Sequence, residues 1–216
     1  MDFFIEIFPI ILEGVWVTIK VSTVGALIAL AVAVVAGSAR ASNNRILRTI
    51  AGIYVEVFRG TSALVQMFWI YFVLPLPPFN LSLTAFQAGA LALGLNVGAY
   101  MAEVVRGGIN AVDKGQIEAS IALNMTPMLR LRRVILPQAL VRILPPVGNL
   151  LIDLLKLSSL VSLITLSDMT FHAFQLRPRH FSKTPQIFIM LLLLYFILTR
   201  PITWGIRWIE NKRQWA

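Results

Sequence analysis

The sequence contains no cysteine, and only 13% of its 216 residues are Asp, Glu, Lys or Arg. Disulfide bridges and cysteine-ligated metal sites are therefore excluded. The two histidines, His172 and His180, lie in one polar stretch without further metal-ligand spacing, so no metal site is expected. A chain this poor in charge, with 57% hydrophobic residues, has the composition of a membrane protein rather than of a soluble domain.

Several functional motifs are also missing. The sequence has no Gly-rich loop ending in Lys and Ser or Thr, the motif that binds nucleotide phosphates. No Ser/His/Asp, Cys/His or paired-carboxylate set converges at one depth, so neither catalysis nor a cofactor is expected in this chain. The opening residues carry Asp2, Glu6 and Glu13 instead of a basic segment, which predicts an uncleaved first span that stays as an anchor.

Charge-free runs predict an all-α, polytopic membrane protein with five transmembrane helices. We expect a single domain over residues 1–216, with its membrane core at about 15–208. The first predicted span is 21–39, which is long enough to cross a hydrocarbon core of about 30 Å. The run 60–102 holds no charge and is broken by Pro75, Pro77 and Pro78, so it predicts two spans. A fourth is expected at about 143–166 and a fifth at about 186–208.

The distribution of the 19 Lys and Arg predicts the orientation. With the N-terminus outside and the C-terminus inside, only Lys20, Arg177, Arg179 and Lys183 fall outside and Lys156 lies within a span, so the remaining fourteen are cytoplasmic. Because the basic residues gather at the ends of apolar segments, the net charge of +9 indicates topology and contact with lipid headgroups rather than nucleic acid. The segment 103–142 is then a cytoplasmic loop.

Residues 113–137 form a polar, amphipathic insertion in this loop. Asp113 with Gln116 three positions later predicts a helix start of the capping-box type, and Pro127 is expected to end that helix. One face is apolar (Ile117, Ile121, Met125), small residues could admit a close neighbour (Ala119, Ser120, Ala122), and three arginines follow (Arg130, Arg132, Arg133). Periodicity alone is equally consistent with an ordinary interfacial helix.

The spacing within this insertion resembles the EAA loop of ABC importer permeases. Glu118-Ala119, Asn124 and Leu136-Pro137 stand at the offsets of Glu-Ala-Ala, glycine and Leu-Pro, with Ser120 for the second alanine and Asn124 for the glycine. Asn is the commonest non-glycine residue in left-handed conformation, so the turn at Asn124 is expected to survive. Further segments are similar to permeases of the histidine, glutamate, arginine and opine type: 58–66 (FRGTSALVQ), 99–109 (AYMAEVVRGGI), 114–116 (KGQ) and 136–139 (LPQA).

This resemblance implies the partners and the location. It implies a five-helix permease that works as a dimer in the bacterial inner membrane, with a second permease subunit and a periplasmic or lipid-anchored solute-binding protein. ATP and Mg would be bound by a separate ATPase subunit, which would dock on the loop. The residues implied in coupling are Gly115, Glu118, Ala119, Ser120, Asn124 and Pro137.

A charged pair lies inside the fourth predicted span. Charges at the centre of a membrane helix cost about 2.5 to 3.5 kcal/mol each, so they pair, face a cavity or serve function. Asp153 and Lys156 are one turn apart and can form a purely structural pair. The family resemblance instead places Lys-Asp-Thr-Ser beside the translocation path, where this chain has Lys156-Leu157-Ser158-Ser159. The substrate-pathway residues expected on this basis are Lys156, Asp153, Ser158, Ser159 and Gln66.

Other polar residues near the span ends have two explanations. Glu56 with Arg59 and Glu103 with Arg106 are spaced to form ion pairs on one helix face. Gln66, Asn96 and Tyr100 could line a cavity or bond across helices. Gly89, Gly94 and Gly98 are expected at close helix contacts. The predicted function is import of polar amino acids or related zwitterions; the alternatives are import of a compatible solute such as ectoine and a non-transporting scaffold.

Overall fold

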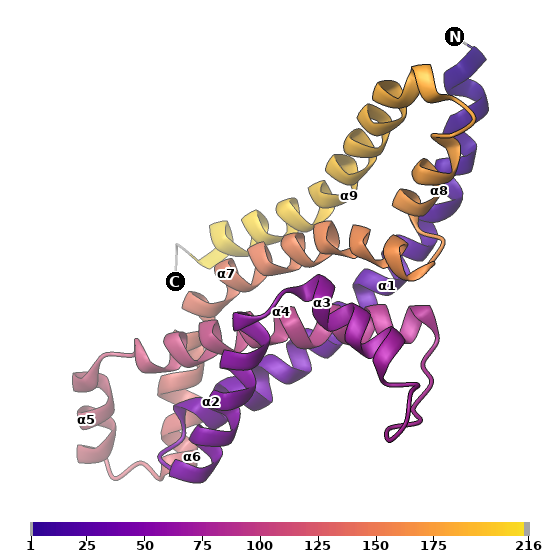
Figure 1. Ribbon diagram of the computed structural model, residues 1–216. Helices are drawn as coiled ribbons and strands as arrows, with labels where there is room; N and C mark the ends of the chain where they lie inside the picture. Colours follow the sequence, from indigo (N-terminus) through magenta and orange to yellow (C-terminus); the bar gives the residue numbers. More distant parts are fainter. Residues whose placement is uncertain (1, 214–216) are drawn as a thin grey trace.

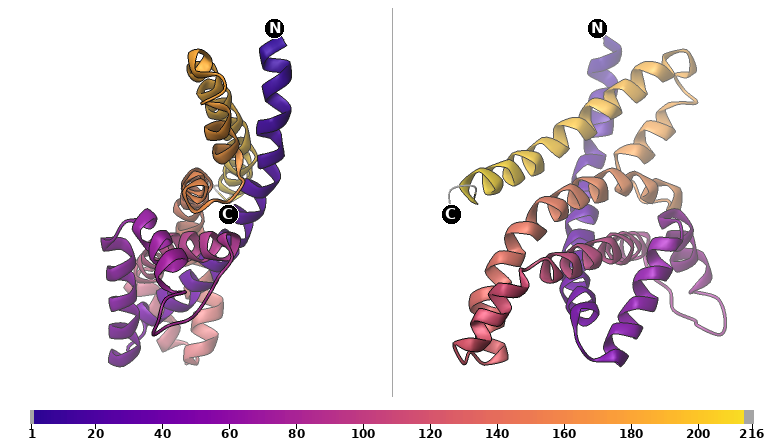
Figure 2. Two further views of the ribbon diagram at one scale, coloured as in Figure 1. Left: turned by 45° about the vertical axis from the view of Figure 1, so that its right-hand side comes forward. Right: turned by 90° about the vertical axis from the view of Figure 1, so that its left-hand side faces the viewer.

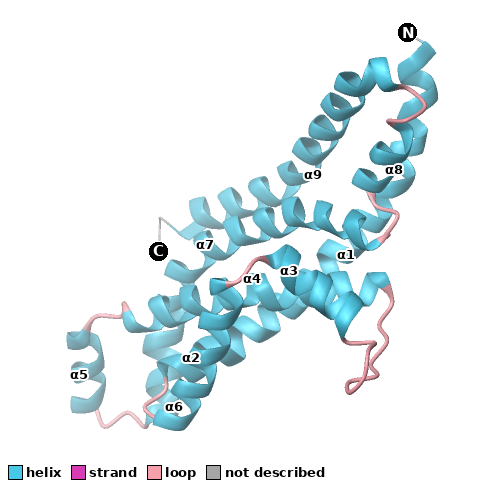
Figure 3. Ribbon diagram, in the orientation of Figure 1, coloured by secondary structure: helices cyan, strands magenta, loops and turns pink. Residues whose placement is uncertain are grey.

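The computed structural model describes residues 2–213, and every regular element in that range is a helix (Figure 3). The α-helices are α1 (Asp2–Ala41), α2 (Arg45–Gly60), α3 (Ala63–Phe68), α4 (Ala85–Asn110), α5 (Lys114–Ala122), α6 (Pro127–Arg130), α7 (Leu136–Leu157), α8 (Met169–Leu176) and α9 (Thr184–Arg213). Single π-helical turns, Trp69–Val73 and Leu131–Ile135, extend α3 and α6, and a 3₁₀ segment, Ser158–Ile164, extends α7. The all-α class is confirmed.

Four helices in the described range are long and apolar enough to cross a membrane: Glu6–Ala41, Ala85–Asn110, Pro127–Ile164 and Phe181–Trp208. The second predicted span, the first half of 60–102, is a shorter apolar helix, Ala63–Val73. At 1.5 Å per residue it spans about 16 Å, roughly half of a hydrocarbon core. The amphipathic helix α2 comes before this helix in the chain. The two are separated by a break at Thr61 and Ser62, whose backbones are extended. Five membrane crossings therefore remain a prediction.

Side-chain caps explain where two of the helices begin. The Asn44 carboxamide oxygen accepts hydrogen bonds from the backbone N–H groups of Ile46 and Leu47, so α2 starts immediately after Asn44. At the start of α4, the Thr84 hydroxyl accepts from the Gln87 N–H, and the Gln87 side chain accepts from the Thr84 N–H. This reciprocal arrangement is a capping box.

The core is built mainly by α1 lying against α4. Residues of α4 on this face are small, which lets the two backbones approach closely. A methyl group added to Gly94 would lie 2.6 Å from Cβ of Ile28, and one added to Gly98 would lie 3.1 Å from Cβ of Val32. Gly89 likewise meets Val161, at 3.0 Å. The expectation that these glycines mark close helix contacts is confirmed.

The arrangement of the helices separates the two ends of the molecule (Figures 1 and 2). The start of α1 lies at one end together with the connection between α8 and α9, while α5 lies at the other end with the connection between α1 and α2. The basic residues Arg40, Arg45 and Arg48 belong to that second connection or flank it. The end that holds α5 is therefore also rich in Arg, as the predicted orientation requires.

Candidate functional site

The break between α2 and α3 is stabilised by side chains that bond to the last turn of α2. The final carbonyl groups of a helix have no partner within it. Here the Phe58 carbonyl accepts from Nε2 of Gln66 at 2.9 Å and from Nδ2 of Asn96 at 3.0 Å, and the Arg59 carbonyl accepts from the Tyr100 hydroxyl at 3.3 Å. Gln66 Oε1 also accepts from Nδ2 of Asn96, at 3.1 Å. Gln66, Asn96 and Tyr100 thus bond across helices.

Asn96 and Tyr100 also line a polar cavity of about 330 Å³ beside this break. The cavity lies between the α2–α3 junction, α4 and α7, and its lining residues are Thr61, Ser62, Ala63, Asn96, Val97, Tyr100, Leu150, Asp153 and Leu157. Asn96 and Tyr100 therefore do both things that the sequence allowed: they line a cavity and they bond across helices. Gln66 is outside the lining, and it acts by holding Asn96 and the α2 terminus in place.

Asp153 supplies the carboxylate of this cavity. Its Oδ1 lies 3.4 Å from Nζ of Lys156, and the two side chains remain 56% and 61% exposed. The predicted pair is therefore formed, and of its two residues Asp153 lines the cavity while Lys156 lies outside the lining. Leu157, at the position of the aspartate in the Lys-Asp-Thr-Ser pattern, lines the same cavity four residues after Asp153. Residues four apart share one helix face, so Asp153 offers a carboxylate one turn away from the expected position.

Ser158 and Ser159 are placed differently from the expectation that both face the substrate. Ser158 is fully buried, and its hydroxyl donates to the Leu155 carbonyl at 2.7 Å. The Ser159 hydroxyl donates to the Lys156 carbonyl at 2.9 Å. These hydroxyl groups satisfy carbonyls at the end of α7, where the α-helix tightens into 3₁₀ geometry, and neither serine lines the cavity.

The predicted docking helix is α5, which projects at the end of the molecule (Figure 1). Asp113 caps it by accepting from the Gly115 N–H at 2.7 Å, without the Gln116 contact of a capping box. The helix ends at Ala122, because the chain turns at Asn124. Asn124 has the left-handed conformation that was predicted for it, with a φ of 54°. Pro127 begins the next helix, α6, instead of terminating this one.

Of the six residues implied in coupling, five are exposed and one is buried. Gly115, Glu118, Ala119 and Asn124 are exposed along α5 and its turn, and Pro137 is exposed in the first turn of α7. Ser120 is 2% exposed, and its hydroxyl donates to the Ile117 carbonyl. Ser120 therefore faces the rest of the chain, so a contact between its side chain and a partner is not supported, while Glu118 and Ala119 remain accessible.

The ion pairs around Glu103 include one that the sequence did not predict. Arg106 pairs with Glu103 at 2.9 Å, as predicted, and Arg40 of α1 pairs with the same carboxylate at 2.8 Å. The Arg40 contact joins α1 to α4 and was not predicted, because it depends on how the two helices pack. Glu56 and Arg59 do not form the predicted pair in the described range; the Arg59 guanidinium lies over the Tyr100 ring, 5.2 Å from its centroid.

A second buried polar cluster lies at the opposite end, around α8. Asp168, which is fully buried, caps α8 by accepting from the Phe171 N–H at 2.8 Å, and it accepts from the Tyr195 hydroxyl of α9 at 3.2 Å. The Met169 N–H donates to the Thr18 hydroxyl of α1 at 3.3 Å. Sequence reasoning missed this short helix. The signal was Asp168 directly before an apolar segment, the pattern of an N-terminal cap.

These features define a helical, membrane-spanning protein with an open polar cavity among its helices and an exposed helix at one end. The family described as "Binding-protein-dependent transport system inner membrane component" matches residues 6–214. The chain belongs to this family. It is a multi-pass cell-membrane protein and a permease component of an ABC transport system, in agreement with the resemblance of its EAA loop.

Related sequences cover nearly the whole chain. A probable amino-acid ABC transporter permease protein, y4tF of Sinorhizobium fredii, is 42% identical over 204 residues, which is 93% of this chain and 85% of that protein. The arginine transport system permease protein ArtQ of Bacillus subtilis is 36% identical over 204 residues, 94% of this chain and 92% of its own length.

Solved structures share the fold. The crystal structure of an amino acid ABC transporter with histidines superposes with a TM-score of 0.87 at 34% identity, covering 96% of both chains. The MetNI methionine ABC transporter in an inward-facing conformation superposes with a TM-score of 0.75 at 23% identity, covering 95% of this chain and 96% of that one. The MetNI comparison supports the fold alone.

Proposed function

We propose that this chain is a translocation subunit of an ATP-driven importer for polar amino acids or related zwitterions. Relatives named for amino-acid, glutamine and arginine transport support this substrate class. The observation that carries the proposal is the cavity between α4 and α7, which holds one accessible carboxylate, Asp153. A carboxylate there can accept the ammonium group of an amino acid, which would otherwise lose its hydrogen bonds to water without compensation.

The substitution Asp153→Asn tests this assignment. It keeps the shape of the side chain and removes the charge, so we expect uptake of the native solute to fall about 10- to 100-fold, the range for losing a charge-assisted hydrogen bond. Uptake would be measured in proteoliposomes containing the complete transporter. Ser159→Ala, which lies outside the cavity lining, is the matched control and should transport normally. Full uptake by Asp153→Asn and by Lys156→Ala would instead indicate a scaffold subunit.

The second part of the proposal concerns coupling to the ATPase partner, which would bind ATP and Mg. Glu118 and Ala119 are exposed on a short helix at the Arg-rich end, with the spacing of the EAA loop. An arginine at position 119 would place a bulky charge where a small residue allows close contact, so Ala119→Arg should abolish ATPase co-purification. Met128→Arg, which is 72% exposed but outside α5, is the control. Full association and uptake by Ala119→Arg would place the docking site elsewhere.

A further inference from the structure

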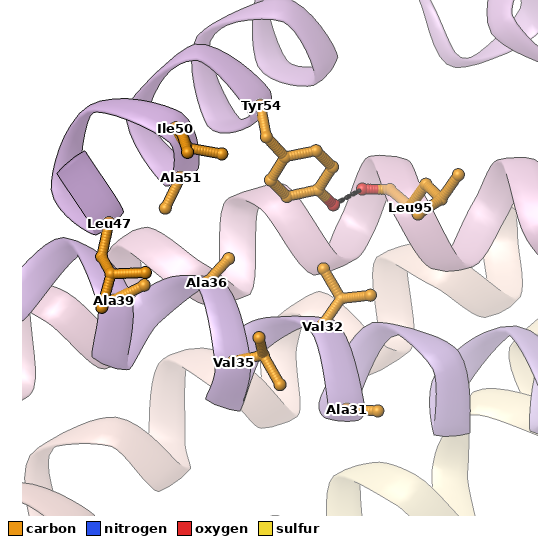
Figure 4. A pocket seen from close by; sticks show the side chains of 10 residues that line it. All are labelled: Ala31, Val32, Val35, Ala36, Ala39, Leu47, Ile50, Ala51, Tyr54 and Leu95. Atoms are coloured by element: carbon orange, nitrogen blue, oxygen red, sulfur yellow. Dashed lines mark hydrogen bonds between the residues drawn. The ribbon is translucent and has the colours of Figure 1, made fainter.

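Two hollows in the structure differ in the polar groups that they offer. An apolar groove of about 490 Å³ lies between α1 and α2 (Figure 4). Its one polar side chain is that of Tyr54, whose hydroxyl already donates to the Leu95 carbonyl at 2.6 Å. The polar cavity beside the α2–α3 break is lined by Asn96, whose side-chain oxygen has no donor among residues 2–213. This oxygen can accept a hydrogen bond from a solute.

The surrounding hydrogen bonds fix the orientation of the Asn96 carboxamide. A carboxamide nitrogen carries two hydrogens, and Nδ2 of Asn96 donates both, to the Phe58 carbonyl at 3.0 Å and to Oε1 of Gln66 at 3.1 Å. Nε2 of Gln66 in turn donates to the Phe58 carbonyl at 2.9 Å and to the Thr61 hydroxyl at 2.6 Å. Reversing either carboxamide would place two acceptors against each other, so Oδ1 is the atom of Asn96 that is left without a partner.

The Asn96 oxygen stays accessible, although the residue is only 4% exposed. The buried polar atoms without a hydrogen-bond partner in the described part of the chain belong to Ser22, Arg40 and Glu103, so Oδ1 of Asn96 is not sealed from solvent. The open space that Asn96 lines is the polar cavity. Oδ1 therefore presents an acceptor to this cavity, and the two hydrogen bonds of Nδ2 hold it in place.

Asn96 complements the carboxylate that lines the same cavity. Asp153 belongs to α7 and Asn96 to α4, so the cavity has acceptors on two helices. An ammonium group carries three N–H donors, and a donor that is buried without an acceptor is costly. Oδ1 of Asn96 supplies a second acceptor without adding charge. A quaternary ammonium group carries the same charge but has no N–H to donate, so it gains nothing from Asn96.

We propose that Asn96 binds the ammonium group of the solute through Oδ1, beside Asp153, and thereby selects cations that carry N–H donors over quaternary ammonium ions. This rests on the proposed function, because it assigns the polar cavity to the solute. The structural alternative is that Asn96 only holds the end of α2, through Nδ2. The two roles use different atoms of one side chain, so only the first depends on the chemistry of the solute.

The test compares an amino acid with its trimethylated form. The complex of permeases and ATPase is placed in nanodiscs without the solute-binding protein, so that only the membrane complex binds solute. A panel of radiolabelled polar amino acids identifies the one that binds most tightly, and its affinity is compared with that of its Nα-trimethyl derivative. We expect the native complex to prefer the amino acid by about tenfold or more, the contribution of a hydrogen bond to a charged group.

Two variants separate the roles of Asn96. Asn96→Leu keeps the approximate size of the side chain and removes the acceptor, so the preference for the amino acid should fall by about tenfold or more. Gln66→Leu also removes bonds to Asn96 and to the end of α2, but the Phe58 carbonyl still holds Nδ2 of Asn96. The preference should therefore be retained in Gln66→Leu, even where both solutes bind more weakly.

Three outcomes would contradict the proposal, and they can be told apart. Equal binding of the two solutes by the native complex would overturn it without requiring any variant to fold. An unchanged preference in Asn96→Leu would leave Asn96 with its role at the end of α2 alone. Binding of no polar amino acid by the native complex would remove the proposed function itself, and the role of Asn96 with it.

Discussion

Asp168 is a carboxyl group held entirely away from water, in the connection between the spans that end at Ile164 and begin at Phe181. Burial raises its pKa from 3.8 to about 6, and the hydrogen bonds from Phe171 and Tyr195 oppose this shift only in part. Between about pH 4 and pH 6 the folded chain therefore retains a proton that the unfolded chain releases. The free energy of unfolding must fall as pH rises through this window, and it stays lower above pH 6.

We predict that Asp168→Asn removes most of this pH dependence. The asparagine oxygen can still cap α8, while the cost of a buried charge, on the order of 3 kcal/mol for a shift of about two units, disappears. Thermal unfolding of the detergent-purified transporter at pH 4.5 and pH 7 provides the measurement. The fall in Tm between these pH values should be larger for the native chain than for the variant. Equal pH profiles would contradict the assignment.

Gly94 and Gly107 form a matched pair on one helix. Substitution Gly94→Ala would place a methyl group 2.6 Å from Ile28, whereas nothing lies within 4 Å of a methyl group at position 107. We predict that Gly94→Ala lowers the free energy of unfolding by about 1 to 3 kcal/mol through overpacking. Gly107→Ala should be neutral or mildly stabilising, because alanine favours helix by about 1 kcal/mol. Thermal unfolding of both variants would show whether Gly94 sets the α1–α4 distance.

Residues with local geometry could be predicted from the sequence. The left-handed turn at Asn124 and the Asp153–Lys156 and Glu103–Arg106 pairs each depend on neighbours within one turn. The Arg40–Glu103 pair could not be predicted, because it requires the packing of α1 on α4. The burial of Ser158 could not be predicted either, because the sequence does not show that its side chain turns inward at the end of α7.

At the level of elements, the main difference between the predicted helices and the structure is the break after Gly60. The sequence shows a long charge-free run, but the helix that enters it begins at Arg45, and the chain is extended at Thr61 and Ser62. This break persists because distant side chains, those of Asn96 and Tyr100, bond to carbonyls of the last turn of α2. Such partners lie about 40 residues away, so no local pattern could indicate them.

The break also shapes the cavity between α4 and α7. Thr61, Ser62 and Ala63 contribute to its lining only because the chain leaves helical geometry there. The candidate site was therefore predictable in part. Asp153 could be singled out from the sequence, because a charge within a membrane span is costly. The contribution of the α2–α3 junction could be seen only in the folded structure. Gln66, which was expected in the substrate pathway, bonds to Asn96 and to the Phe58 carbonyl, beside the residues that form the wall.

For the whole molecule, the orientation is still a prediction from the distribution of Lys and Arg. A reporter enzyme that is active only outside the cytoplasm should work when fused after Leu76, in the loop between α3 and α4, and fail when fused after Lys114. A reporter active only in the cytoplasm should give the opposite result. Activity of the first reporter after Lys114 would place α5 outside and remove the basis for its docking to an ATPase.

Whether this chain pairs with a copy of itself or with a different permease is the remaining question at this scale. In a symmetric homodimer both halves of the solute site would carry Leu157, where the Lys-Asp-Thr-Ser pattern offers a carboxylate, and each would depend on Asp153 alone. We propose a heterodimer, in which a different permease keeps the complete pattern and this chain forms the weaker half of the site. The competing explanation is a solute with a delocalised cation, such as a cyclic compatible solute, which needs no second carboxylate.

The substitution Leu157→Asp distinguishes the two explanations. Leu157 faces the cavity, so an aspartate there is solvated and should be tolerated; repulsion from Asp153 four residues earlier costs only about 0.5 kcal/mol. In a heterodimer the variant should keep the selectivity of the native transporter or gain a second site for amino acids, because the partner already binds the ammonium group. For a delocalised cation, transport of the native solute should fall. Solute binding and uptake by the reconstituted complex measure this difference, and purification of this chain as a homodimer active with ordinary polar amino acids would refute both explanations.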